Sequence, residues 1–123
     1  RRAGCTLRDY TLAGHYNGRS LDTFDADAEC IALWACSAED GYWVAVDQLT
    51  PTRFRVFDRA TLAPAGVFSG KVTSNTDGET VYAMPTPRFP AGALFALHND
   101  VSLAAFDLRD IARALDLKGD CPR

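Results

Sequence analysis

A repeat of about fifty residues constrains the fold of this chain more than any other feature of its sequence. The apolar segment GYWVAV at residues 41–46 recurs as GALFAL at residues 92–97, which is 51 positions later. The pair Phe57-Asp58 recurs as Phe106-Asp107, which is 49 positions later. Short β segments separated by turns, repeated with a period near this length, are typical of β-propeller blades. We therefore expect an all-β chain that contains two copies of one sheet.

The two copies have definite expected boundaries. The first copy predicts a four-stranded blade at about residues 27–70, and the second predicts three strands of a blade at about residues 77–106. Residues 7–13 predict one strand of a neighbouring blade, and residues 14–18 read as a turn. A closed propeller needs about four to eight blades. We therefore expect about two blades of a larger ring, completed either by a longer chain or by associating copies; three copies would supply about six blades.

A short helix is expected after the second copy, at about residues 107–117. Asp107 is the expected N-cap, and Asp110 at the third helical position resembles the acidic member of a capping box. Gly119 marks the expected stop. One face of the helix is an apolar stripe at helical spacing, formed by Leu108, Ile111, Ala112 and Leu115. Such a stripe predicts that the helix packs against the edge of a sheet.

An acidic turn precedes the first apolar run of each copy. Asp27 and Glu29 stand in the first turn, and Asp77 stands 48 positions after Glu29 in the second turn. The start of an innermost propeller strand lies beside the central channel, so these carboxylates are expected to converge there. Calcium takes about six to eight oxygen ligands, and neighbouring carboxylates repel one another unless a cation is bound. We predict calcium binding by Asp27, Glu29 and Asp77; the alternative is that they are ordinary solvated turn residues.

The net charge and the cysteine content limit which partners and which cellular compartment are expected. The net charge of −3 and the absence of a basic stripe argue against nucleic acid, and no apolar run is long enough to span a membrane. Four cysteines favour an oxidising compartment, either secreted or periplasmic. Cys5 and Cys121 are the expected disulfide, because chain ends are often close in space. A strand between Cys30 and Cys36 would separate their Cα atoms by about 20 Å, which is too far for a disulfide. We therefore expect each of them to be a buried thiol or to bond to another cysteine.

From about Gly18 to Leu115 the chain resembles the C-terminal third of β-propeller phytases, which hydrolyse myo-inositol hexakisphosphate with calcium. The motifs that carry the resemblance are DAE at 27–29, DGYW at 40–43, RFRVF at 53–57, SNTDG at 74–78, FPAGALFAL at 89–97 and the terminal helix. The resemblance implies a six-bladed propeller in which Asp27, Glu29 and Asp77 are calcium ligands. The bound ions would hold substrate phosphates and activate a water, so that no covalent nucleophile is needed.

The chain departs from the family pattern at several positions. Cys30 replaces a glycine, Lys71 replaces an expected acid, and the turn after the 92–97 segment reads His98-Asn99-Asp100. Lys71, Arg19 and His98 are the candidates for contact with the phosphates of phytate or another phosphate ester, although a lone histidine is more often structural. The isolated segment is expected to be inactive without its remaining blades. The alternative function is a binding or assembly module with at most a structural calcium.

Overall fold

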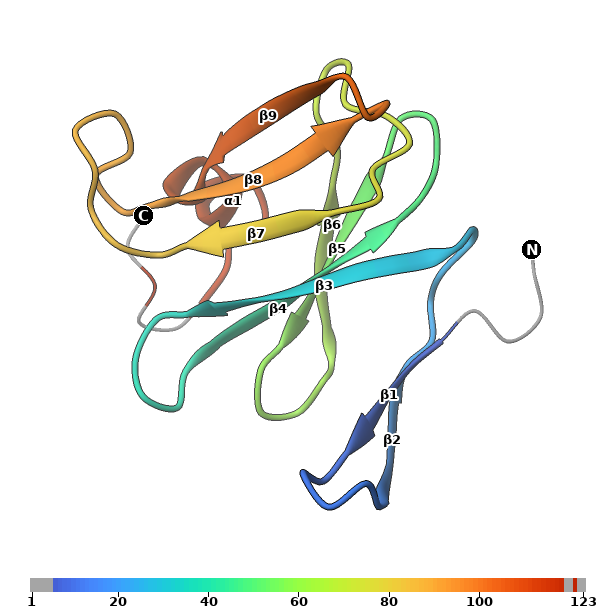
Figure 1. Cartoon of the computed structure of the whole chain (residues 1–123). Coiled ribbons are helices and arrows are strands. Elements are labelled where there is room, and N and C mark those ends of the chain that lie inside the picture. The colour runs from blue at the N-terminus through green and yellow to red at the C-terminus, as the bar shows by residue number, and fades with distance from the viewer. Residues whose placement is uncertain (1–5, 119–120, 122–123) are drawn as a thin grey trace.

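The computed structural model describes residues 6–118 and residue 121, and within them the chain is all-β apart from one short helix (Figure 1). The prediction of an all-β chain is confirmed. The described strands form three antiparallel sheets. A two-stranded hairpin contains β1 (Leu7–Tyr10) and β2 (Tyr16–Leu21); sheet B contains β3 (Ala28–Ala35), β4 (Gly41–Asp47), β5 (Arg53–Asp58) and β6 (Pro64–Phe68); sheet C contains β7 (Glu79–Tyr82), β8 (Ala93–His98) and β9 (Ser102–Asp107). The helix is α1 (Leu108–Ala114).

Sheets B and C repeat one another pair by pair. Trp43 pairs with Phe57 across β4 and β5, and Leu94 pairs with Phe106 across β8 and β9, at the offsets of 51 and 49 positions seen in the sequence. All six residue pairs between these strands follow the same correspondence. The first strands, β3 and β7, correspond at an offset of 48. The repeat in the sequence is therefore a repeat of strand order and register.

A glycine stands at the start of β4 and immediately before β8, at corresponding positions of the repeat. Gly41 and Gly92 both have positive φ values, 147° and 93°. A Cβ atom on Gly41 would collide with the backbone oxygen of Trp34, and a Cβ atom on Gly92 would collide with that of Tyr82. Only glycine combines this backbone conformation with so close an approach of two strands.

The main hydrophobic core lies between sheets B and C. Its largest fully buried side chains come from both sheets and from α1, and they include Trp34, Phe54, Leu94 and Leu108. Burial of each such side chain stabilises the fold by about 1.5–3 kcal/mol. The rings of Phe54, Phe68 and Phe106 pack together with centroids 4.9–5.6 Å apart. A smaller core, which we call the hairpin core, lies between sheet B and β1–β2 and is built on Leu21, Phe24, Ala45 and Phe57.

The predicted helix forms, with a shorter extent than expected. Asp107 is the N-cap, and its carboxylate accepts a hydrogen bond from the Arg109 amide at 2.9 Å. Asp110 does not complete a capping box in the structure; it forms an ion pair with Arg113 at 2.7 Å. The helix ends at Ala114, and Gly119 lies outside the described residues. The apolar stripe packs into the core between sheets B and C, and the helix contacts β9 at the edge of sheet C.

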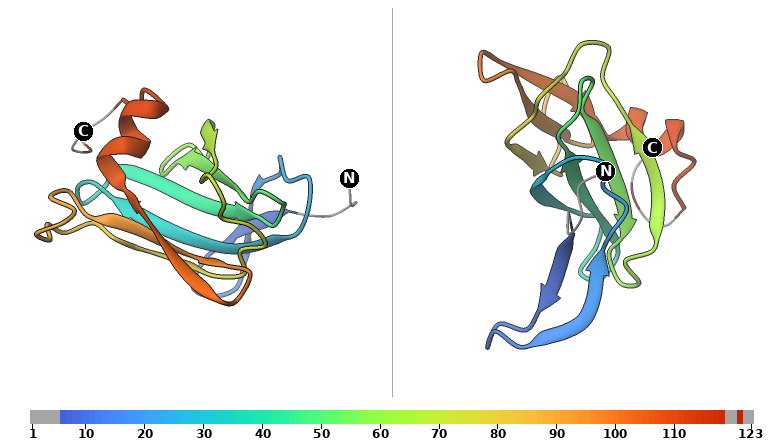
Figure 2. Two further views of the ribbon diagram at one scale, coloured as in Figure 1. Left: turned by 90° about the horizontal axis from the view of Figure 1, so that it is seen from above. Right: turned by 90° about the vertical axis from the view of Figure 1, so that its right-hand side faces the viewer.

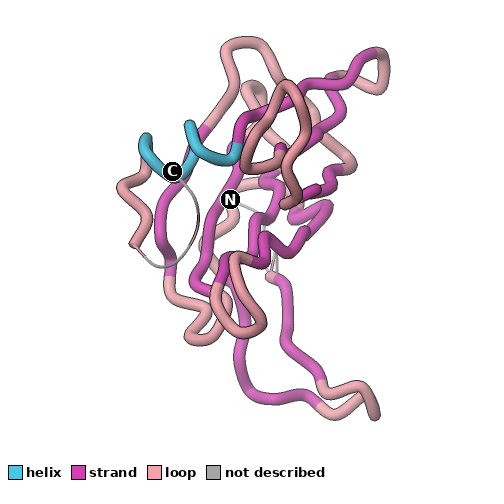
Figure 3. The backbone as a smooth tube through the Cα atoms, turned by 90° about the vertical axis from the view of Figure 1, so that its left-hand side faces the viewer, coloured by secondary structure: helices cyan, strands magenta, loops and turns pink. Residues whose placement is uncertain are grey.

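The N-terminal part differs from the prediction of a single strand at 7–13 and a turn at 14–18. The structure instead contains the hairpin β1–β2, whose second strand begins at Tyr16. Four of the six residues of β2 are exposed, so the strand lacks the alternation of buried and exposed side chains that identifies strands in sequence. Figures 2 and 3 show the hairpin extending away from the two larger sheets, on a different side of the molecule from α1.

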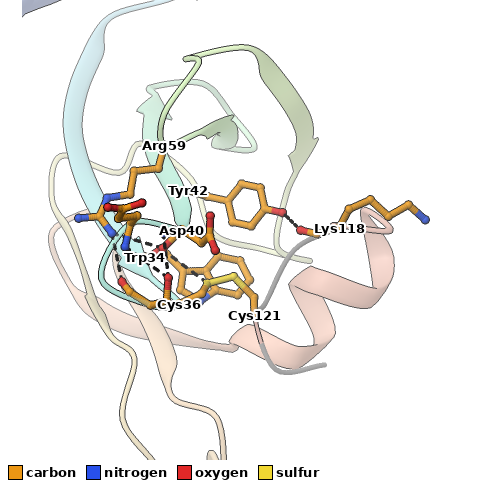
Figure 4. Close-up of a disulfide and its surroundings, with 9 residues drawn as sticks. Trp34, Cys36, Asp40, Tyr42, Arg59, Lys118 and Cys121 are labelled. Atoms are coloured by element: carbon orange, nitrogen blue, oxygen red, sulfur yellow. Dashed lines mark hydrogen bonds between the residues drawn. A yellow bond between two sulfur atoms is a disulfide. The ribbon is translucent and has the colours of Figure 1, made fainter.

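The disulfide prediction was wrong in its pairing. Cys121 bonds to Cys36, with Cα atoms 4.8 Å apart, and not to Cys5, which lies outside the described residues. The chain after α1 returns to the β3–β4 turn, where the Tyr42 hydroxyl donates a hydrogen bond to the Lys118 carbonyl (Figure 4). Proximity of the chain ends was therefore a poor guide. The expectation that Cys30 and Cys36 do not pair is confirmed.

Among the residues that the structure describes, no helix is both long enough and apolar enough to cross a bilayer.

Candidate functional site

The two acidic turns lie at the same end of sheets B and C and are joined by Gln48. The backbone N–H of Gln48 donates to the Asp27 carbonyl at 3.0 Å. Its side-chain amide donates to the Asp77 carboxylate. Gln48 directly follows β4, so one residue of sheet B links its own acidic turn to that of sheet C. We call this end of the molecule the acidic rim, formed by residues 25–29, 47–48, 74–79 and 98–100.

Asp100 belongs to the acidic rim, although the sequence did not identify it as a site residue. It lies in the β8–β9 turn, where Asn99 and Asp100 both have positive φ values that these residue types tolerate. A hydrogen bond to Asp77 and the repulsion between the two carboxylates raise the pKa of Asp100 above its ordinary value. The only sequence signal was the turn composition itself, because 23 positions separate Asp77 from Asp100.

A buried carboxylate fixes the turn that carries Asp27. Asp47 is fully buried and accepts hydrogen bonds from the backbone amides of Asp25 and Ala26 at 2.9 and 2.7 Å. The guanidinium of Arg55 forms an ion pair with the same carboxylate at 2.7 Å. Both oxygens of Asp47 are thereby used, as a buried charge requires. The turn before Asp27 is held by β4 and β5 rather than being a loose loop.

His98 has the corresponding role in sheet C. It stands 51 positions after Asp47, and its Nδ1 atom accepts a hydrogen bond at 3.0 Å from the Ser74 amide. Ser74 stands 48 positions after Ala26, so each sheet anchors the turn before its first strand at the same position. The Asn99 amide also donates to the Ser74 carbonyl at 3.0 Å. His98 thus lies at the rim, where its Nδ1 atom is occupied by the Ser74 amide.

Arg19 lies away from the acidic rim. Its guanidinium binds Asp9, with an ion-pair distance of 2.6 Å, and the Ala60 carbonyl at 2.8 Å. The Arg19 hydrogen bond holds the pKa of Asp9 below its ordinary value. Ala60 is in the β5–β6 turn, at the end of sheet B opposite Asp47 and the start of β5. Arg19 therefore supports the hairpin, and the structure does not bring it together with the other predicted site residues.

The remaining predicted residues lie at the acidic rim or, in the case of Lys71, in the loop between β6 and β7. Asp27 is half-buried, whereas Glu29 on β3 and Asp77 before β7 are exposed. Lys71 is exposed in the loop that leads from β6 to β7. Within residues 6–118 and 121, no three His, Cys, Asp or Glu side chains are grouped closely enough to hold a metal ion. A complete calcium coordination shell needs about six to eight oxygens.

Glu79, the first residue of β7, is a buried acid that the sequence did not single out. Both of its carboxylate oxygens are buried without a hydrogen-bond partner, although the residue as a whole is half-buried. Burial alone raises its pKa from 4.5 to about 9. The corresponding residue of sheet B is the apolar Ile31, 48 positions earlier. On the neighbouring strand β3, the Cys30 thiol donates to the Glu79 carbonyl at 3.7 Å.

Comparison with known proteins gives no relative: no family model, no curated protein and no solved structure matches the chain.

Proposed function

We propose that this chain is part of a β-propeller phosphomonoesterase that uses calcium to hydrolyse phytate or a related phosphate ester. In this proposal sheets B and C are two blades of a ring of about six, and the acidic rim faces the central channel. The observation that supports it best is the link from Asp27 through Gln48 to Asp77, with the Asp100 carboxylate beside Asp77. In the proposal, the carboxylates of the two acidic turns would meet at this place.

The donor chemistry of the rim suits a hard divalent cation. Asp77 and Asp100 offer carboxylate oxygens whose mutual repulsion a cation would relieve. Asp27 and Glu29 would contribute from the neighbouring turn, and waters or other blades would supply the remaining ligands. Bound calcium would neutralise substrate phosphate and lower the pKa of a coordinated water. The described residues would hold the ion and orient the substrate. Lys71 would contact a phosphate group, because an ammonium group suits a phosphate.

A second candidate function is a non-catalytic binding or assembly module with at most a structural calcium. It is favoured by the lack, in the described part of the chain, of any cluster of three potential metal ligands. Cys30 and Lys71, which stand where the phytase pattern has a glycine and an acid, favour it as well. The two functions differ in a simple way, because only the enzyme releases phosphate.

The compartment proposed is the cell exterior or the periplasm. The Cys36–Cys121 disulfide is consistent with an oxidising environment, because thiols are kept reduced in the cytosol.

Calcium titration of the chain by calorimetry tests the site. Wild type is expected to bind calcium, and Asp77→Asn and Asp100→Asn are expected to weaken binding at least tenfold. Asp110→Asn is the matched control, because Asp110 is an exposed acid on α1 that pairs with Arg113. Equal affinity in the rim and control variants, or no binding by wild type, would contradict the proposed site.

Phosphate release from phytate tests the reaction. The assay uses the chain completed by its remaining blades, as wild type and as Asp77→Ala. Release that is lost in Asp77→Ala supports the enzyme. Calcium binding without any phosphate release by the complete ring would leave the assembly module as the function.

A further inference from the structure

A groove runs beside β1, between the hairpin and sheet B. Its volume is about 470 Å³, and all four residues of β1 line it. Ile31 and Trp43 of sheet B form its apolar floor, and Ile31 is 40% exposed. Among the described strands, β1 pairs only with β2, so its other edge has backbone groups without a strand partner. An unpaired edge beside an apolar floor is the arrangement to which β-strands add.

The groove continues an interface that already exists. Leu7, Leu21, Trp43 and Leu62 line the groove and also pack in the hairpin core. The hairpin core is therefore open on the side of the groove. A side chain that enters the groove would extend the hairpin core rather than form a separate one.

The register of the hairpin indicates which kind of strand would fit the groove. Two successive pairs of β1–β2 recur 47 positions later in β5–β6, and a register shift follows in both hairpins. The pairs are Leu7 with Leu21 and Arg8 with Ser20, and then Phe54 with Phe68 and Arg55 with Val67. The hairpin β1–β2 thus corresponds to the outer half of sheet B. In sheet B the other edge of β5 is occupied by β4, antiparallel to it.

We propose that the groove binds an extended β-strand, antiparallel to β1 and resembling β4. By the correspondence, it would carry a small residue opposite Arg8, as Ala45 stands opposite Arg55, and aliphatic residues at the flanking positions. In sheet B those flanking residues are Val44 and Val46, which are fully buried against sheet C. In the groove their counterparts would lie on the floor formed by Ile31 and Trp43.

The correspondence favours a separate strand over the β4 strand of a second folded copy. The β4 strand of a second copy is paired on both edges, with β3 and β5, and its valines are buried, so it has no free edge to offer. The edges that the described strands of a second copy do leave free, such as those of β1 and β9, are the competing occupants, and dimer formation by the chain without peptide detects them. The occupant that we propose is a strand from outside the described residues, and the proposal does not depend on calcium or phosphate chemistry.

A peptide with the sequence of residues 40–48, carrying two added lysines at each end, serves as the probe. Its addition to the isotopically labelled chain is expected to slow amide exchange in β1 at least tenfold, with no such change in β9. The control peptide has its two valines replaced by aspartate and is expected to leave β1 unchanged. Ile31→Lys in the chain is expected to abolish the effect, and because Ile31 is partly exposed the variant should fold.

A second experiment detects binding that is too weak to see with the free peptide. The same strand is fused upstream of the chain through a flexible linker, because tethering raises its effective concentration. The fusion is expected to protect β1 and to raise Tm relative to the fusion with the aspartate-substituted strand. Equal protection by both strands, or no protection of β1 even in the fusion, would overturn the proposal. A chain that forms dimers protecting the β1 edge without any peptide would also overturn it, in favour of self-association.

Discussion

Sheets B and C have the same strand order and register, yet they hold their acidic turns with different chemistry. In sheet B the anchor is the buried carboxylate of Asp47, paired with Arg55. In sheet C the anchor is the imidazole of His98, which makes one hydrogen bond to the Ser74 amide. The shared framework depends on residue pairs and glycines that repeat. The rim residues differ between the two sheets without a change in strand register, so the binding properties of the rim can change while the fold is kept.

The comparison predicts unequal costs for removing the two anchors. Asp47→Ala leaves the Arg55 guanidinium buried without its main partner, and loss of one member of a buried pair costs about 3–5 kcal/mol. His98→Ala removes the hydrogen bond from the Ser74 amide and a longer one with the Asn99 side chain, and is expected to cost about 1–2 kcal/mol of unfolding free energy. Urea unfolding monitored by far-UV circular dichroism measures both. Equal costs would show that the anchors are energetically alike, contrary to the comparison.

Alanine at the two repeated glycines tests whether the sheets are equivalent where they look alike. Gly41→Ala and Gly92→Ala each place a Cβ against a backbone oxygen of the preceding strand. We expect each to destabilise the fold by about 2 kcal/mol or more, and by similar amounts. The same urea measurement checks this. Gly78→Ala is the control, because a Cβ there makes only an ordinary contact; a larger loss in the control would contradict the expectation.

Glu79 is a difference between the two sheets that makes the free energy of unfolding depend on pH. Its pKa is 4.5 when unfolded and about 9 when folded, so folding binds a proton between these values. The contribution of Glu79 to the unfolding free energy is therefore most favourable below pH 4.5 and falls as pH rises to about 9, by up to about 1.4 kcal/mol per pH unit.

Glu79→Ile gives sheet C the residue that sheet B has at this position, and Glu79→Gln removes the charge at nearly constant shape. Both are expected to flatten this pH dependence and to stabilise the protein by about 1–3 kcal/mol at pH 7. Thermal unfolding from pH 5 to pH 9 provides the measurement. If wild type and Glu79→Gln lose stability in parallel across this range, Glu79 is not the titrating group.

The smallest expected effect concerns the two acids of sheet C at the rim. Asp77 raises the pKa of Asp100, so their repulsion grows as Asp100 ionises with rising pH. Without calcium, Asp100→Asn is expected to increase Tm slightly at pH 7 and to have no effect at pH 3. With calcium the order should reverse, because the variant loses a ligand. A variant that behaves identically with and without calcium would remove Asp100 from the site.

The sequence predicted the repeated sheets and the capped helix, and it missed the hairpin and the disulfide pairing. The offsets of 51, 49 and 48 positions anticipated the register of sheets B and C, because apolar alternation and turn glycines are local signals. The strand β2 was missed because most of its residues are exposed. The Cys36–Cys121 bond depends on how the chain folds back after α1, which no local pattern specifies.

The candidate site was predictable to a similar degree. The turn containing Asp77 was identified because it repeats Glu29, but its neighbours Gln48 and Asp100 come from other connections of the two sheets. Arg19 was chosen for its charge alone, and its partners Asp9 and Ala60 show that it supports the hairpin. Convergence of residues that are distant in sequence is a property of the tertiary fold. It becomes visible only in three dimensions.

The most direct test of the account is a crystal structure of the chain grown with saturating calcium. The account predicts an ion at the acidic rim, bound by carboxylate oxygens of Asp77 and Asp100, with Gln48 still joining the turns of sheets B and C. A rim without an ion at saturating calcium, or two turns that have separated with Gln48 facing solvent, would contradict it.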